Sequence, residues 1–301
     1  MSDSFTTPDI PALNGRTILI TGGSRGVGLA TAQALAGAGA RVVLAVRDLD
    51  RGRRVAAQIP GQATARELDL ASLASVRAFA ATWKSPLDVL INNAGVSAPT
   101  LRRTADGFEL QFGTNHLGHF ALTNLLLEHI TDRVVTLGSQ AERAGRIDFD
   151  DVNFERRAYK TSTAYNQSKL ANLLFSAELQ RQLTRAGSLV LAQTAHPGLV
   201  NTNIYDESGA FAQRFVRRLG QSPQLGALPV LYAAVADIVG DSFVGPSRMM
   251  HMRGAPELIK RSKRASDPQL AERLWSVSEQ LTGTRFPLNG SVPAAAQSTT
   301  R

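Results

Sequence analysis

The chain has 301 residues, which is long for one domain and short for two complete α/β domains. Hydrophobic residues make up 43% of it and charged residues 19%, a balance that excludes an intrinsically disordered protein. There is no cysteine, which excludes disulfide bonds, thiolate metal sites and a cysteine nucleophile and agrees with a reducing compartment.

The formal net charge of +8 raises the question of a nucleic-acid partner. The basic residues lie in scattered groups without interleaved aromatic residues, so solvated helix faces explain them better, with attraction of an anionic cofactor or substrate as a second contribution. No signal peptide is visible, and the longest apolar stretch, residues 225–239, carries Asp237 and is too short to span a membrane. We therefore expect a cytoplasmic protein with no nucleic-acid partner.

Residues 1–15 are polar and predict a loose N-terminal arm that at most tucks Ile10 and Leu13 against the body. The apolar run at Thr17–Thr21 then predicts a strand, and residues 29–38 predict a helix. The turn between them reads Gly-Gly-Ser-Arg-Gly-Val-Gly from position 22 to position 28. In this context glycines let backbone N–H groups approach a pyrophosphate, and the helix N-terminus favours its negative charge. The pattern predicts nucleotide binding, with an ordinary turn as the alternative.

Residues 41–46 predict a second strand, and the end of this strand is where a dinucleotide-binding fold distinguishes its cofactors. Arg47 lies there, and a guanidinium pairs with a 2′-phosphate, whereas a carboxylate would accept ribose hydroxyls. Arg25 is a second candidate for the same contact. Asp48 is an alternative ribose acceptor, but it precedes a helical stretch at 49–59 and fits helix capping better. The sequence therefore favours NADPH over NADH.

The alternation of strands and helices continues along the chain. Strands are expected at residues 64–68, 87–91 and 133–137, and helices at residues 73–84 and 108–129. Asp69, after the third strand, either contacts adenine or caps the next helix. The pattern predicts an α/β fold with a doubly wound, Rossmann-type, mostly parallel sheet of about seven strands and helices on both faces, whose ligands bind beyond the carboxyl ends of the strands.

Tyr165 and Lys169 lie four residues apart in a helical stretch at 162–182, so both side chains project from one face. A phenol has a reference pKa of about 10, and a nearby cation favours the phenolate and moves the pKa toward the working range. Tyr-x-x-x-Lys also arises by chance on exposed helices, so the pair predicts an acid–base catalyst only in the company of the other motifs.

Taken together, these motifs resemble the short-chain dehydrogenase/reductase family. The matching positions are the glycine-rich turn at 21–28, the Asn-Asn-Ala-Gly turn at 92–95, Asn115, Ser139, Tyr165, Lys169 and the Pro-Gly turn at 197–198. Their order and separations agree over residues 15 to about 203. Residues 151–156, 165–174 and 274–282 further resemble the retinol dehydrogenase and protochlorophyllide reductase-like branch.

The resemblance implies a role for each polar residue, with local structure as the alternative. Tyr165 would protonate a carbonyl oxygen as hydride arrives, or act as the base in the alcohol direction, and Lys169 would lower its pKa and bind the nicotinamide ribose. Ser139 would donate a hydrogen bond to the substrate oxygen, and Asn115 would hold a water that links Lys169 to solvent. The residues expected to bind the cofactor are Gly22, Ser24, Arg25, Gly26, Val27, Gly28, Arg47, Asp69, Leu70, Asn93, Ala94, Gly95, Tyr165, Lys169, Pro197, Gly198, Val200 and Thr202.

Three histidines could be mistaken for metal ligands or site residues. His116 and His119 lie on one predicted helix, but no carboxylate or third histidine accompanies them at ligand spacing, so packing is favoured and no metal site is expected. His196 precedes the Pro-Gly turn, and the sequence leaves open whether it lines the site.

The sequence beyond residue 203 is less regular. A substrate lid is expected at about 203–225, where apolar residues at helical spacing favour a hydrophobic substrate or simply a packed helix. Helices are expected at 225–239 and 268–281, and the seventh strand at 245–252. We expect an N-terminal arm at 1–15, one catalytic domain at 16–286 and a disordered tail at 287–301.

The sequence thus predicts an NADP(H)-dependent carbonyl reductase or alcohol dehydrogenase that acts on a bulky, largely apolar ketone, aldehyde or secondary alcohol. An NAD-linked dehydrogenase of the same family is one alternative, and a non-catalytic dinucleotide-sensing regulator is another. Such regulators usually lack the Tyr, Lys or Ser, and all three are present here. The resemblance implies a homodimer or homotetramer, although monomers occur in the resembled branch.

Overall fold

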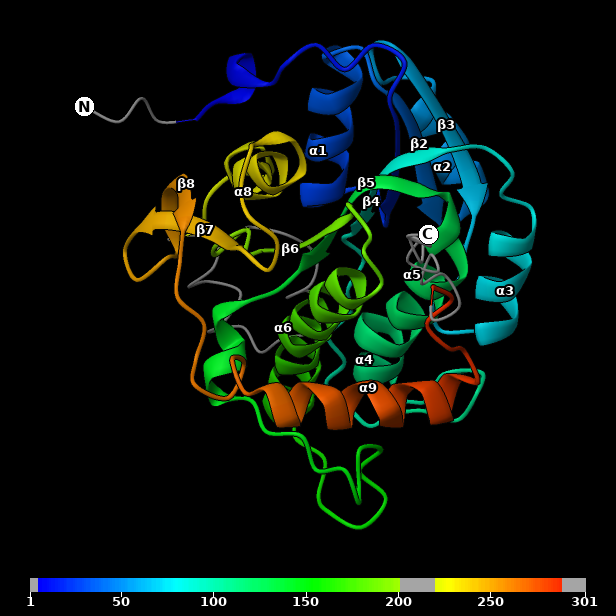
Figure 1. Cartoon of the computed structure of the whole chain (residues 1–301), viewed down its shortest axis with the longest axis vertical. Coiled ribbons are helices and arrows are strands. Elements are labelled where there is room, and N and C mark those ends of the chain that lie inside the picture. The colour runs from blue at the N-terminus through cyan, green and yellow to red at the C-terminus, as the bar shows by residue number, and fades with distance from the viewer. Residues whose placement is uncertain (1–4, 201–219, 289–301) are drawn as a thin grey trace, which may run out of the picture.

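An eight-stranded sheet in the order β3-β2-β1-β4-β5-β6-β7-β8 runs through the middle of the molecule (Figure 1). The computed structural model describes residues 5–200 and 220–288. Neighbouring strands are parallel except for β7 and β8, which are antiparallel. The strands are β1 (Thr17–Thr21), β2 (Arg41–Val46), β3 (Gln62–Glu67), β4 (Leu87–Asn92), β5 (Ile130–Leu137), β6 (Leu191–Ala195), β7 (Phe243–Arg248) and β8 (Arg253–Leu258).

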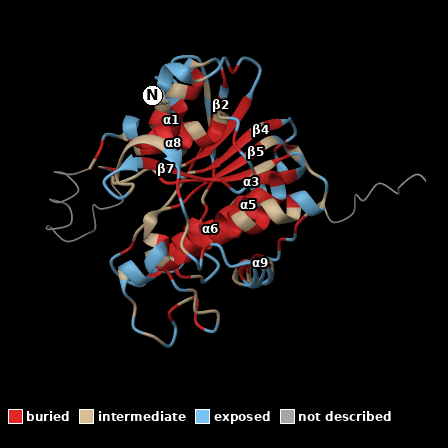
Figure 2. Ribbon diagram, turned by 60° about the vertical axis from the view of Figure 1, so that its left-hand side comes forward, coloured by how far each residue is buried: buried red, intermediate tan, exposed pale blue. Residues whose placement is uncertain are grey.

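Helices cover both faces of this sheet, which confirms the doubly wound α/β fold. Figure 2 shows the buried strands between α1 and α8 on one side and α3, α5 and α6 on the other. The helix α9 packs against α6 as an outer layer, where the rings of Trp275 and Phe175 stack with centroids 5.9 Å apart. The helices are α1 (Gly26–Gly37), α2 (Leu49–Ala56), α3 (Leu73–Ala81), α4 (Leu110–Phe112), α5 (Gly118–Leu126), α6 (Thr161–Arg185), α8 (Pro223–Val235) and α9 (Pro268–Thr282).

The central strand β1 shows why this sequence forms a buried parallel sheet. All five of its residues are buried, because helices cover both faces. Ile18 and Ile20 pack into the core beneath α1 and α8, whereas Leu19 between them packs into the core beneath α3 and α5. Each such side chain contributes roughly 1.5–3 kcal/mol by leaving water.

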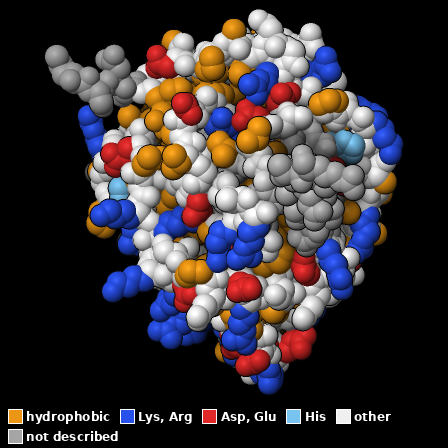
Figure 3. Space-filling model, in the orientation of Figure 1, with side chains coloured by type: hydrophobic (Ala, Val, Ile, Leu, Met, Phe, Trp, Pro, Cys, Tyr) orange, Lys and Arg blue, Asp and Glu red, His pale blue; other side chains and the backbone are white. Residues whose placement is uncertain are grey.

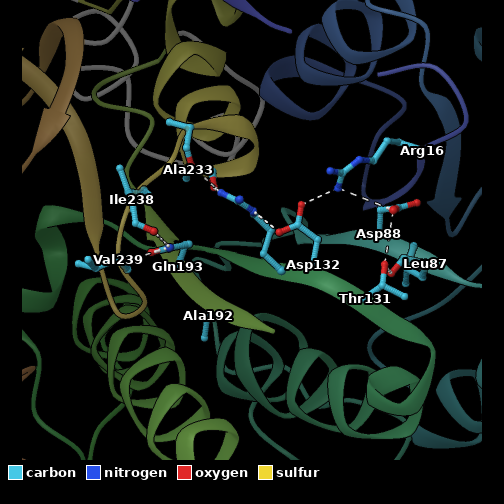
Figure 4. A network of polar contacts seen from close by, with 12 residues as sticks. Arg16, Leu87, Asp88, Thr131, Asp132, Ala192, Gln193, Ala233, Ile238 and Val239 are labelled. Atoms are coloured by element: carbon cyan, nitrogen blue, oxygen red, sulfur yellow. Dashed lines mark hydrogen bonds and ion pairs between the residues drawn. The ribbon is translucent and has the colours of Figure 1, made fainter. Parts of the chain in front are cut away.

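Polar contacts join the amino-terminal ends of the strands, on the sheet edge opposite the glycine-rich turn (Figure 4). Arg16, just before β1, donates a hydrogen bond to Asp132 at 2.6 Å and lies 3.7 Å from Asp88. In the middle of β6, Gln193 donates to the carbonyl oxygens of Ile238 and Val239, which precede β7, at 3.3 and 3.0 Å. These contacts hold the strands in register at the end away from the site.

The predicted seventh strand is displaced, and an eighth was not predicted. The strand expected at 245–252 begins earlier, at Phe243, and ends at Arg248. It ends there because Met249, Met250 and His251 adopt left-handed φ angles of 52°, 55° and 65°, which reverse the chain into the antiparallel β8. Gly254 and Pro256 hide β8 from a sequence pattern, since neither favours a strand.

The single helix predicted at 108–129 is interrupted. A short α4 is followed by a π-helical turn at Gly113–Leu117, where the N–H of Gly118 donates to the carbonyl of Gly113. The helix α5 then ends at Leu126, and a 3-10 turn leads into β5 at Ile130. The apolar spacing predicts the segment but not the extra residue in its turn.

The N-terminal arm contacts the core. In the N-terminal arm, Leu13 is buried in the core and Ile10 packs against it, while Thr7–Asp9 forms a 3-10 turn. The expected lid lies mostly outside the described residues, and its last residues form the first turn of α8, which begins at Pro223. Most of the predicted tail also lies outside them.

Basic side chains on the face drawn in Figure 3 are scattered among acidic ones and form no single patch.

Candidate active site

A cavity of about 620 Å³ opens where the parallel strands β1, β2, β4, β5 and β6 end. Because these strands are parallel, the residues that follow each of them meet at the same edge of the sheet. The cavity is lined by every predicted catalytic or cofactor residue in the described chain except Asn115, which is fully buried behind it. Thr202, the remaining predicted contact, lies outside the described residues.

The glycine-rich turn brings backbone N–H groups to the cavity. Gly22 has a φ of 67°, and a Cβ there would lie only 3.1 Å from the Cα of Ala94. A Cβ on Gly28 would overlap the side chain of Asn93. With Ser24 and Val27 also on the cavity wall, the N-terminus of α1 at Gly26 faces the cavity, as a pyrophosphate site requires.

The turn after β4 is tied to the end of β1. The N–H groups of Asn93 and Ala94 each donate to Thr21 Oγ1 at 2.9 Å, and the Asn93 side chain donates to the Thr21 carbonyl at 2.7 Å. These bonds hold Ala94 and Gly95 against the glycine-rich turn. Residues 92–95 thus complete the cavity wall on the side of β4.

Three arginines border the cavity beyond β2. Arg25 and Arg47 were predicted there, and Arg51, in the first turn of α2, joins them. The Oδ1 of Asp48 accepts a hydrogen bond from the Arg51 N–H at 2.9 Å, which confirms its interpretation as the helix cap. The sequence analysis placed Arg51 on a solvated helix face. Its position in the first turn of α2, three residues after the cap, is the signal that puts it near the end of β2.

Asp69 and Leu70 line the cavity beyond β3. The carboxylate of Asp69 accepts from the Ala71 N–H at 2.9 Å, whereas Ser72 is the residue that caps α3. The capping alternative for Asp69 is therefore wrong. A Cβ on Gly118 would overlap the Leu70 carbonyl, so this glycine allows α5 to lie close against the turn.

Tyr165 and Lys169 project from one face of α6, as their spacing predicts. Tyr165 is half-buried, while Lys169 is 4% exposed and its Nζ lies 5.6 Å from the centre of the Tyr165 ring. The ammonium donates to the carbonyl of Leu137, the last residue of β5, at 3.2 Å. Burial lowers the pKa of Lys169 to about 8, because a desolvated cation is disfavoured.

Ser139 lies two residues beyond β5, in a turn that is held in place by residues distant in the sequence. Its Oγ accepts a hydrogen bond from the Ala141 N–H at 3.2 Å. Three residues on, the fully buried Glu142 accepts from the N–H and the hydroxyl of Ser262 at 2.9 and 2.5 Å. The neighbouring Arg143 donates to the carbonyl of Lys260 at 2.9 Å. The segment before α9 therefore positions the serine turn.

The polar atoms of Asn115 are all engaged. Its side-chain oxygen accepts from the Val96 N–H at 2.8 Å, and its amide donates to the Val96 carbonyl and to Ser168 Oγ, both at 3.0 Å. Ser168 in turn donates to the carbonyl of Tyr165 at 2.8 Å. The main-chain carbonyl of Asn115 lies 3.0 Å from Nδ1 of His119.

The turn after β6 closes the cavity. Pro197, Gly198 and Val200 line it, and Gly198 has a φ of 79° against the carbonyl of Met252. His196 lines it as well, which settles the question left open by the sequence. Burial, and after it the charge of Lys169, lowers the pKa of His196 to about 3. Sequence reasoning also missed Arg102, which borders the cavity from a loop without a motif.

Residues 16–212 match the family described as short chain dehydrogenase. The chain belongs to the short-chain dehydrogenase/reductase family. It is 41% identical to human retinol dehydrogenase 13, over 93% of this chain and 88% of that protein. It is 38% identical to mouse polyprenol dehydrogenase, over 93% of this chain and 87% of that protein.

One solved structure is also closely similar to this short-chain dehydrogenase/reductase. It is an uncharacterised protein from Mycobacterium paratuberculosis, with 49% identity, a TM-score of 0.84 and coverage of 95% of this chain and 100% of that chain. These similarities confirm the family and its retinol dehydrogenase-like branch.

The enzyme is therefore an oxidoreductase that acts on CH–OH groups with a nicotinamide dinucleotide. Within residues 5–200 and 220–288, no helix is both long enough and apolar enough to cross a bilayer.

Proposed function

We propose that the enzyme is an NADP(H)-dependent carbonyl reductase or alcohol dehydrogenase for bulky, largely apolar ketones, aldehydes or secondary alcohols. The observation that carries the proposal is the convergence of Tyr165, Lys169 and Ser139 on one cavity at the carboxyl ends of the strands. The bound nicotinamide supplies or accepts the hydride. The side chains supply the proton and hold the oxygen.

In this proposal Ser139 and Tyr165 hold the reacting oxygen. The Ser139 Oγ accepts from the Ala141 N–H, so its own hydrogen is left to donate to the substrate oxygen. This donation stabilises the negative charge that develops on a carbonyl oxygen as hydride arrives. The Tyr165 hydroxyl donates the proton that converts this oxygen to an alcohol, and the reverse transfer serves oxidation.

Lys169 supports the proton transfer. With its pKa near 8 it is cationic at neutral pH, and a cation beside the phenol favours the phenolate that remains after the proton has left. Asn115, in the π-helical turn that precedes α5, would bind the water that returns a proton from solvent to Lys169. Its side chain is tied to Tyr165 through Ser168, which supports a fixed geometry for this relay.

The choice of NADP(H) rests on the rim beyond β2. Arg25, Arg47 and Arg51 border the cavity where the adenosine ribose would lie, and Asp48, the nearby carboxylate, is engaged as a helix cap. Guanidinium groups match a 2′-phosphate in charge and geometry. This arrangement supports the phosphorylated cofactor over the NAD-linked alternative.

The choice of an apolar substrate rests on the relatives. Retinol and polyprenol, the alcohols named in the two relatives, are long and apolar. Val96 and Leu110 are apolar residues of the cavity lining. A cytoplasmic location and a homodimer or homotetramer stay predictions from the sequence.

The test is a panel of ketones, aldehydes and alcohols, each assayed with NADPH or NADP⁺ and with NADH or NAD⁺. We expect turnover of apolar members with the phosphorylated cofactor. Tyr165→Phe should keep cofactor affinity and lower kcat by a factor of roughly 10² to 10⁴, the usual contribution of a general acid. Substantial residual activity in Tyr165→Phe would remove the assigned role, and cofactor binding without any turnover would favour the regulator.

A further inference from the structure

His116 and His119 lie three residues apart and are each 1% exposed, yet their rings point to different parts of the molecule. The Nε2 of His116 lies 2.8 Å from the hydroxyl of Ser278 in α9, and its ring packs between Phe112 and Phe120. The ring of His119 contacts the site instead. Its Nε2 lies 2.9 Å from Thr21 Oγ1 and its Nδ1 lies 3.0 Å from the Asn115 carbonyl.

The partners of His119 define its tautomer. A carbonyl oxygen only accepts, so Nδ1 carries the proton and donates it to Asn115. Nε2 is then the acceptor, and the Thr21 hydroxyl donates to it. Thr21 Oγ1 already accepts from two backbone N–H groups at 2.9 Å, and its other possible acceptor, the Ile91 carbonyl, is farther away at 3.4 Å. Every polar atom of this chain of contacts therefore has a partner.

The imidazole is also held neutral. Burial lowers the pKa of His119 to about 4, the hydrogen bond to Asn115 opposes this shift, and the charge of Lys169 adds to it. A neutral ring keeps one donor and one acceptor, which is what its two contacts require. The same ring as a cation would lose the bond from Thr21.

The position of this ring relative to the π-helical turn gives it a role. The turn at Gly113–Leu117 places Asn115 in a part of the helix where the backbone bonds span an extra residue. His119 takes up one lone pair of the Asn115 carbonyl. The ring therefore fixes the orientation of this carbonyl, which in the proposed reaction would bind the relay water.

We propose that His119 is a positioning residue that orients the Asn115 carbonyl and couples it, through Thr21, to the Asn93–Ala94 turn of the cofactor site. The proposal rests on the proposed function, because it assigns the carbonyl to the proton relay of that reaction. His116 is the matched control, because it is an equally buried histidine only three residues away whose ring nitrogen contacts Ser278 in α9.

The first experiment needs no turnover. The protein is labelled with ¹⁵N-histidine, and its five histidine rings are assigned by single substitutions. Between about pH 5 and pH 9, where an ordinary histidine titrates, His119 should stay neutral with its proton on Nδ1. Its resonances should shift when NADP⁺ is added, while those of His116 should not. A proton on Nε2, a protonated ring or an unchanged His119 spectrum would overturn the proposal.

The second experiment separates the two contacts of the ring. An asparagine amide reaches the Nδ1 position of histidine, and a glutamine amide reaches the Nε2 position. His119→Asn should therefore keep kcat within about twofold, whereas His119→Gln and His119→Phe should lower it by about tenfold, the effect of losing one oriented hydrogen bond.

Further readouts distinguish positioning from folding. The solvent isotope effect on kcat should rise in His119→Gln and His119→Phe, because proton return becomes slower, while the Kd for NADPH stays within about twofold. His116→Phe should change neither kcat nor the isotope effect. Equal losses in the His116 and His119 variants, or a loss in His119→Asn as large as in His119→Gln, would refute the role. Absence of turnover in the native enzyme would instead contradict the proposed function. The histidine spectra would then be the only test of the role of His119.

Discussion

The two halves of the cavity are built in different ways. The cofactor half consists of the glycine-rich turn, the turn at 92–95 and the arginines beyond β2, and it is made mostly of backbone and exposed side chains within the first hundred residues. The reaction half consists of Asn115, Ser139, Tyr165 and Lys169, of which Asn115 and Lys169 are buried. Its positions depend on distant segments, since Glu142 and Ser262 are 120 residues apart. Damage far from the cavity should therefore impair the reaction half first.

The largest effect should come from Lys169→Met. Loss of the cation should lower kcat by a factor of roughly 10² or more, the range for removing acid–base support. The same change should stabilise the protein by about 3 kcal/mol at neutral pH, because burial has lowered the pKa of this lysine from 10.5 to about 8.

The sign of the stability effect can be checked by pH. Below pH 8 the lysine is charged in both the folded and the unfolded chain, so the native protein bears the whole cost of burial. As pH rises toward 10.5 the folded group is neutral first and the cost disappears. Denaturation of both proteins at several pH values measures the gap, with Lys84→Met as the exposed control. A gap that grows with pH would contradict this account.

Glu142→Ala should separate the two halves. It leaves the half-buried N–H and hydroxyl of Ser262 without an acceptor, which should cost roughly 1–3 kcal/mol of folding free energy. The serine turn should loosen, so kcat/KM for a carbonyl substrate should fall while the Kd for NADPH is kept. Calorimetric titration and steady-state kinetics measure these quantities, with the exposed Glu128→Ala as control. Equal weakening of cofactor binding would argue against independent halves.

Arg47→Asp tests the rim of the cofactor half. Replacing the guanidinium by a carboxylate should weaken NADPH binding by about tenfold and favour NADH, since it removes a charge-assisted bond and adds repulsion. The kcat with saturating NADH should not change. Arg53→Asp, in the nearby helix α2 but outside the cavity lining, is the control. An unaltered ratio of the two affinities would count against the phosphate contact.

Asp48→Ala should have the smallest effect. Loss of the cap of α2 should cost about 1 kcal/mol of stability, and the preference between NADPH and NADH should be unaffected. Chemical denaturation and binding titrations give the two values. A change in preference would restore Asp48 as a ribose acceptor.

Local patterns predict the cofactor half almost residue by residue. The glycines, Arg47 and Asn93 stand at short spacings that a linear sequence displays. The Tyr165–Lys169 pair of the reaction half is predicted in the same way. The interrupted helix at 108–129 was missed because a π-helical turn leaves the apolar pattern nearly intact. The role now proposed for His119 was hidden because its partner Thr21 is 98 residues away.

The sequence also could not predict the strand β8 or the contacts of residues 260–262 with the serine turn. Pro256 and Gly254 disfavour a strand, and pairing with β7 overrides that preference. Glu142 gives no sign in the sequence that Ser262 is its partner. Packing of distant segments determines both features.

The contact between the serine turn and residues 260–264 has a consequence for biosynthesis. A ribosome releases the cofactor half early, when β1, α1 and β4 are complete and can begin to fold as a unit. Glu142 and Arg143 acquire their partners only after Ser262 and Lys260 have left the ribosome. The helix α6 is covered only when α9 has also been made. On the ribosome, the serine turn can therefore reach its final position only after the segment at 260–262 has emerged.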